Sequence, residues 1–166
     1  CMIAVTRRCV FACRAASAWR TVFTWPCHMA ILASSAPMKL DIDRPLVNVL
    51  PEFSIKTRFK DAGPVTVRDM LTHHSGLPSD RFKGMFTKDP ADPATLVTAL
   101  KDEYVATPPG TAFSYSNLSL SLLGAVIAKV AGMDYAAHMD EAVLKPLGMN
   151  GSGYVMRDEL KPRYAR

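Results

Sequence analysis

The apolar run at residues 118–131 constrains the fold of this chain more than any other feature. Apolar side chains there cover nearly every face of a helix, so that helix has to be surrounded by protein. Ser116 or Asn117 stands where a cap for its first turn belongs, and Gly132 stands where a left-handed C-cap belongs. The apolar positions are Leu118, Leu120, Leu122, Leu123, Ala125, Val126, Ile127 and Val130.

Shorter helices are predicted around this segment. The spacing of apolar, capping and proline residues predicts helices near 43–50, 66–71, 92–104 and 134–143. Strand signals are scarce, although residues 151–154 are predicted to begin one. The pattern fits either a compact helical domain or the helical part of a larger α/β protein.

Charge and hydropathy exclude several classes of protein. The chain has 166 residues, 49% of them hydrophobic and 21% charged, which is ordinary globular composition rather than disorder. Its net charge of +5 comes from the first forty residues, which carry five basic and no acidic side chains. The balanced remainder gives no basic face, so we expect no nucleic-acid partner. No run of eighteen apolar residues exists, so no clear membrane span is predicted.

The first 38 residues differ from the rest in composition and are left unassigned. They hold all four cysteines and no glycine. They could be a targeting peptide, a redox or metal cluster, or a stretch translated out of register with its gene. Arg14 and Arg20 interrupt any continuous signal-peptide core, and the cysteine spacing does not match a zinc site. An out-of-frame segment is therefore favoured, the domain is expected at 39–166, and the compartment stays open.

Tyr115 and Asn117 form the candidate chemical site. A Pro-Gly turn precedes them and the central helix follows, and two residues apart in an extended stretch they point the same way. A phenol beside a carboxamide suits proton transfer and the recognition of a carbonyl or amide group. A capping Asn with a core Tyr would leave the same pattern, and spacing alone favours that structural interpretation.

Four segments, in order, resemble the serine β-lactamases and penicillin-binding-protein-like hydrolases. The similarity is closest to the branch of class C β-lactamases, D-alanyl-D-alanine peptidases and esterases, and it covers about residues 39–155. It implies an α+β, β-lactamase/transpeptidase-like fold, of which this chain would supply mainly the helical part and lack most of the antiparallel sheet. The segments are KLDIDRPL (39–46) with LPEF (50–53), VTVRDMLTHHSGLP (65–78), PGTAFSYSN (109–117) and LKPLGM (144–149).

The resemblance also implies roles for individual residues. Tyr115 would be the catalytic tyrosine of a Tyr-x-Asn motif, assisting proton transfer between nucleophile and leaving group. Asn117 would act in catalysis and substrate binding, through a hydrogen bond to the substrate's amide or to the catalytic lysine. His73 would be structural and His74 a surface residue. The substrate would be a small molecule or peptide with a carbonyl centre: a β-lactam, a D-Ala-D-Ala peptide or an ester. No metal ion and no cofactor are implied.

The nucleophile expected from this resemblance is missing. Its Ser-x-x-Lys motif places a lysine amine one helical turn from the serine, and it should precede Lys39. Ser17 has the spacing but is followed by Arg20, whose guanidinium stays protonated, and Ser35 lies four residues before Lys39. We therefore expect this chain to be inactive, although periplasmic or secreted relatives of the intact enzyme are common.

Three hypotheses remain open at this stage. The chain could come from a serine hydrolase that works through an acyl-enzyme and has lost its nucleophile here. It could be a non-catalytic binding module of the same fold. It could also be a small helical interaction protein with no hydrolase ancestry, recruited through its basic N-terminus.

Overall fold

The computed structural model describes residues 40–81, 93–155 and 158–163. The unassigned segment 1–38, with the four cysteines and the Ser17 and Ser35 positions, lies outside these ranges. The described residues form helices and two isolated β-bridges, Pro45–Thr66 and Lys56–Tyr104, but no strand. The elements are η2 (Leu46–Asn48), α2 (Val67–Leu71), α3 (Pro93–Ala99), η3 (Leu100–Asp102), α4 (Asn117–Ala131), α5 (Tyr135–Met139), η4 (Asp140–Leu144) and η5 (Asp158–Arg163).

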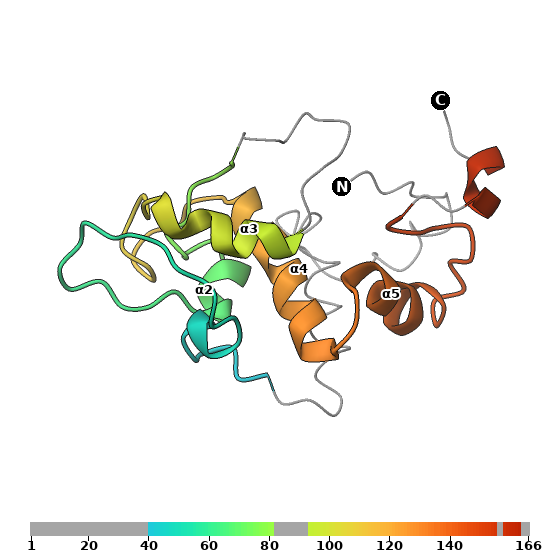
Figure 1. Ribbon diagram of the computed structural model, residues 1–166, viewed down its shortest axis with the longest axis horizontal. Coiled ribbons are helices and arrows are strands. Elements are labelled where there is room, and N and C mark those ends of the chain that lie inside the picture. Colours follow the sequence, from blue (N-terminus) through green and yellow to red (C-terminus); the bar gives the residue numbers. More distant parts are fainter. Residues whose placement is uncertain (1–39, 82–92, 156–157, 164–166) are drawn as a thin grey trace, which may run out of the picture.

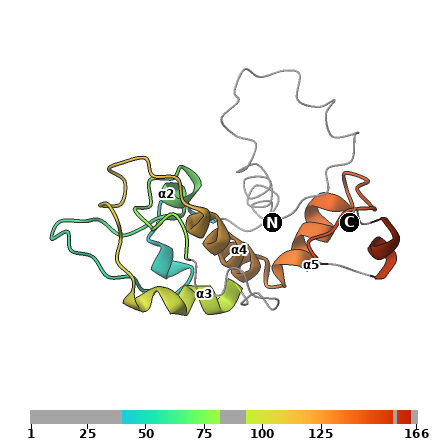
Figure 2. The same ribbon diagram turned by 90° about the horizontal axis from the view of Figure 1, so that it is seen from above.

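Helix α4 is central among these elements, as its composition predicts. Helices α2 and α3 pack on one side of it and α5 continues on the other, an arrangement visible in both views (Figures 1 and 2). Its inward side chains join those of η2, α2 and η3 in one hydrophobic core. The fully buried core side chains are Leu46, Leu50, Val67, Met70, Leu77, Val97, Leu100, Leu122, Leu123, Val126, Ile127 and Met139.

Both ends of α4 carry the caps that its sequence predicts. The Ser116 side chain accepts a hydrogen bond from the Ser119 amide (3.0 Å), so Ser116 rather than Asn117 is the N-cap. Gly132 ends the helix in the left-handed conformation, with φ at 66°. Asn117 is therefore the first helical residue, and its side chain takes no part in the cap.

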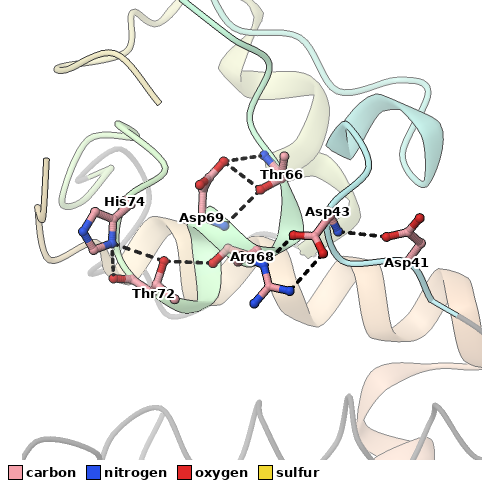
Figure 3. A network of polar contacts seen from close by, with 7 residues as sticks. All are labelled: Asp41, Asp43, Thr66, Arg68, Asp69, Thr72 and His74. Atoms are coloured by element: carbon pink, nitrogen blue, oxygen red, sulfur yellow. Dashed lines mark hydrogen bonds and ion pairs between the residues drawn. The ribbon is translucent and has the colours of Figure 1, made fainter. Parts of the chain in front are cut away.

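Helix α2 is short, and polar contacts in its first turn hold it in place. Thr66 and Asp69 form a reciprocal capping box, in which each side chain accepts the other residue's amide proton (Figure 3). Arg68 makes a two-pronged ion pair with Asp43, with 2.9 Å between Nη2 and Oδ2. Its guanidinium holds the pKa of the Asp43 carboxyl below its ordinary value. The ion pair thereby joins the segment around Asp43 to α2.

Three expectations about local structure are only partly met. The predicted 43–50 helix is a single 3₁₀ turn that follows Pro45. The predicted 92–104 helix ends at Asp102, so Tyr104 lies outside it. The Tyr104 ring instead stacks against Arg58, whose Cζ lies 4.4 Å from the ring centroid. The helix capped by Asp134 widens to a π-helical segment, η4, ahead of Pro146, which has no N–H to donate.

The predicted strand at 151–154 is wrong. This segment forms a turn in which the Ser152 amide bonds the Met149 carbonyl (3.0 Å). The Tyr154 ring then packs edge-on against Tyr135, with 5.3 Å between ring centroids. A strand needs a neighbour to pair with, and the described ranges contain no strand that could accept this segment.

Candidate active site

Tyr115 and Asn117 lie on either side of the buried residue Ser116, at the start of α4. Ser116 is extended, with φ −138° and ψ 109°, and its side chain is fully buried. The flanking side chains are exposed, with Tyr115 44% accessible. The alternation expected of an extended stretch is therefore present, and it directs the phenol and the carboxamide away from the core.

His73 holds the Tyr115 segment from the side. The two rings are 4.6 Å apart between centroids and tilted by 36°, and the His73 Nδ1 accepts the Ser116 amide proton at 3.2 Å. The His73 carbonyl accepts the Ser114 amide at 2.8 Å. Because Nδ1 accepts, the neutral imidazole carries its proton on Nε2. The predicted structural histidine thus directly positions the backbone on both sides of Tyr115.

Serine side chains bind the segment after His73 to the first turn of α4. The Ser75 and Ser119 hydroxyls share a buried hydrogen bond of 2.7 Å. The Ser116 hydroxyl donates to the Pro78 carbonyl at 2.7 Å, and the Leu118 amide donates to the Ser79 carbonyl at 3.1 Å. Two segments forty residues apart in sequence therefore form one rigid unit beneath the candidate site. Sequence patterns gave no sign of the Ser75–Ser119 pair.

Gly76 allows another segment to approach this unit closely. Its φ is +69°, and a Cβ at this position would lie 2.1 Å from the Thr107 carbonyl oxygen. The Gly76 carbonyl accepts the Ala106 amide at 2.7 Å, and the His74 carbonyl accepts the Gly110 amide at 2.8 Å. The Pro-Gly turn that leads into Tyr115 is thereby fastened along residues 74–76.

Asp80 is a residue of the site that sequence reasoning missed. Its Oδ1 accepts a hydrogen bond from the Asn117 Nδ2 at 2.9 Å, and its Oδ2 accepts one from the Ser79 hydroxyl at 2.7 Å. Both hydrogen bonds hold the pKa of the Asp80 carboxyl below its ordinary value, and the one from Ser79 has the larger effect. Only its position two residues after Pro78 could have drawn attention to it.

Three further observations concern His74, a surface recess and metal binding. His74, expected on the surface, is half-buried, with its Nδ1 2.8 Å from the Thr72 carbonyl (Figure 3). A recess of about 410 Å³ opens beside residues 53–65, Val105 and Pro109, and neither Tyr115 nor Asn117 lines it. Within the described ranges no group of three His, Cys, Asp or Glu side chains is arranged to hold a metal ion.

No single helix among the described residues is long and apolar enough to cross a membrane. Helix α4 and the segment Tyr135–Leu144 together pass the same length and composition test, but they meet at 80°.

Comparison with known proteins identifies the family to which this chain belongs. Residues 29–166 match the family model described as Beta-lactamase. The chain therefore belongs to the beta-lactamase family, and its fold is the helical portion of the β-lactamase/transpeptidase fold.

Two relatives and one solved structure illustrate the similarity. The chain is 32% identical over 140 residues to the esterase EstB of Burkholderia gladioli, covering 76% of this chain and 35% of EstB. It is 30% identical over 120 residues to Beta-lactamase-like protein 2 of Dictyostelium discoideum, covering 70% and 22%. It resembles the structure of EstCE1, a hydrolase with promiscuous acyltransferase activity, with a TM-score of 0.69 and 25% identity over 82% of this chain and 39% of that one. The chain thus spans about a fifth to two fifths of the length of these proteins.

Proposed function

We propose that the intact protein is a serine hydrolase that cleaves an ester or amide through an acyl-enzyme. The observation that carries this proposal is the exposed phenol of Tyr115, held rigidly by His73 beside the exposed carboxamide of Asn117. A purely structural Tyr at this position would be expected to bury its ring. The names of EstB and EstCE1 support ester chemistry.

The two side chains have complementary chemical capacities. A phenol at the start of α4 can relay a proton between a nucleophile and a leaving group. A carboxamide offers both an acceptor and donors to a substrate amide or a neighbouring amine. The substrate we propose is a small molecule or peptide with a carbonyl centre, of the ester, β-lactam or D-Ala-D-Ala type.

We further propose that the 166-residue chain does not itself catalyse this reaction. No serine in its sequence is followed three residues later by lysine. An enzyme that works through an acyl-enzyme keeps only weak residual catalysis when its nucleophile is removed. The same observation supports a second candidate, a binding module that keeps the fold without the chemistry.

Reading the gene discriminates between these candidates. The DNA upstream of the Lys39 codon is translated in the other two frames and searched for Ser-x-x-Lys followed by an apolar helix. Its presence supports a hydrolase, and its absence in every frame favours the binding module.

Activity then tests the hydrolase directly. The longer product that contains such a motif is assayed with a p-nitrophenyl ester and a chromogenic β-lactam. Tyr115→Phe is expected to lower kcat by about 100-fold or more while KM changes little, since the phenol proton acts in the transition state. Tyr104→Phe, an exposed tyrosine outside the site, is the matched control and should keep wild-type rates. Equal rates for Tyr115→Phe and wild type would contradict the assigned role.

A further inference from the structure

The hydrogen bond between Asp80 and Asn117 determines which way the Asn117 carboxamide faces. The bond joins Asn117 Nδ2 to Asp80 Oδ1 at 2.9 Å. An ionised carboxylate can only accept hydrogen bonds, so the amide nitrogen has to face Asp80. The amide oxygen is then turned away from Asp80. A 180° flip of the side chain would set two acceptor oxygens against each other.

The chain around Asp80 is itself well fixed. The Ser79 hydroxyl bonds the second carboxylate oxygen at 2.7 Å, and the Ser79 carbonyl receives the Leu118 amide at 3.1 Å. The neighbouring Pro78 carbonyl receives the Ser116 hydroxyl at 2.7 Å. Three consecutive residues thus contact the first turn of α4, where the helix dipole also favours a negative charge.

We infer that Asp80 is a positioning residue, which holds the Asn117 carboxamide so that its oxygen is offered as an acceptor. The groups it would accept from are the N–H of a substrate amide or the amine of a catalytic lysine. This role rests on the proposed hydrolase function. It adds detail to that function, because Asp80 places a fixed negative charge behind the Asn117 carboxamide. The second Nδ2 proton of Asn117 is then available for donation to a substrate.

Substitutions at Asp80 separate orientation from mere packing. Asp80→Ala removes the acceptor, so the carboxamide can flip and rotate. Asp80→Asn keeps an acceptor oxygen of the same size and should partly restore the orientation. Asp61→Asn removes an exposed acid on the turn at residues 59–62 and is the matched charge control.

Two readouts are combined. In ¹⁵N-labelled 166-residue chain, the two Asn117 side-chain amide proton signals are compared among wild type and the three variants, and their exchange with solvent is measured. In the longer gene product, kcat and KM are measured with a p-nitrophenyl ester and with an anilide of the same acyl group. We expect kcat/KM to fall by about 10- to 30-fold in Asp80→Ala, by about threefold in Asp80→Asn and by less than twofold in Asp61→Asn.

The outcomes are distinct. Faster exchange of the Asn117 amide in Asp80→Ala, together with the graded loss of activity, supports the inference. Unchanged amide signals in Asp80→Ala overturn it, and so does altered exchange with kcat/KM equal to that of Asp61→Asn. A wild-type longer product that hydrolyses neither substrate contradicts the proposed function instead. The amide signals then still show whether Asp80 holds Asn117.

Discussion

At the scale of single residues, Gly76 combines a left-handed backbone with a close approach of another segment. Its φ of +69° disfavours a side chain, and a Cβ at this position would lie 2.1 Å from the Thr107 carbonyl oxygen, too close for any residue but glycine. We predict that Gly76→Ala lowers the free energy of unfolding by roughly 3 kcal/mol, because left-handed strain and displacement of the 106–110 segment add together.

Gly63→Ala is the control for this prediction, since nothing lies within 4 Å of a Cβ there. It should change stability by less than about 0.5 kcal/mol. Urea unfolding of the three proteins, followed by circular dichroism, gives the comparison. Equal midpoints for Gly76→Ala and Gly63→Ala would show that the close approach to Thr107 does not exist in solution.

His73 has two structural roles, both of which asparagine could also fill. It accepts the Ser116 amide proton through Nδ1, and its backbone adopts a left-handed φ of 59°. Asparagine tolerates that conformation and its Oδ1 can take the place of Nδ1, whereas alanine can do neither. We expect His73→Ala to cost about 1–3 kcal/mol of unfolding free energy and His73→Asn to recover much of the loss.

Equilibrium unfolding measures the effect, and the Ser116 amide signal in NMR reports the bond itself. A His73→Asn variant as unstable as His73→Ala would show that ring packing against Tyr115, and not the hydrogen bond, is what matters.

At the scale of elements, α2 depends on its capping box, because five residues make too short a helix to persist alone. Thr66→Ala removes the side-chain oxygen that accepts the Asp69 amide, and we predict a loss of about 1 kcal/mol. Thr98→Ala in α3 is the matched control, since that exposed threonine only bonds the carbonyl of Thr95 within its own helix. In thermal unfolding, Thr98→Ala should have the melting temperature of wild type, and Thr66→Ala should have a lower one.

The ion pair that anchors α2 predicts a pH dependence. Arg68 lowers the pKa of Asp43 below its ordinary value of 3.8, so the folded state favours the ionised carboxylate. The stabilisation is therefore complete well above pH 4 and is lost as the pH falls through the lowered folded-state pKa. Asp43→Asn should be less stable than wild type at pH 7, and the gap between the two should shrink as the pH falls below 4. Melting temperatures measured from pH 2 to 7 check this, and a constant gap across that range would contradict it.

The elements also show where sequence reasoning succeeds. Thr66, Ser116, Gly132 and Asp134 were recognisable as helix ends because capping depends on side chains within one turn. The widening to a π-helix before Pro146 and the loss of a strand at 151–154 were not predictable in this way. A strand at 151–154 depends on whether a neighbouring segment offers hydrogen-bond partners, which local patterns do not record. A helix-breaking proline, in turn, does not by itself specify that the preceding turn widens.

At the scale of the whole molecule, the apolar pattern of α4 was enough to predict a central buried helix, and the motif order was enough to predict the family. The arrangement of Tyr115 and Asn117 around buried Ser116 followed from the two-residue period of extended chain. The contacts of Asp80, Ser75 and His73 with α4 did not, since they join segments some forty residues apart. Such contacts leave no periodic signal in a sequence.

We propose that Tyr115 and Asn117 form one half of a catalytic cleft whose attacking serine is absent from these 166 residues. Intact-mass spectrometry after incubation with a fluorophosphonate tests this proposal. We predict no adduct on the 166-residue chain, and one adduct, on the serine of Ser-x-x-Lys, for a longer gene product that contains this motif. Stoichiometric labelling of the 166-residue chain itself would show that its nucleophile is present after all.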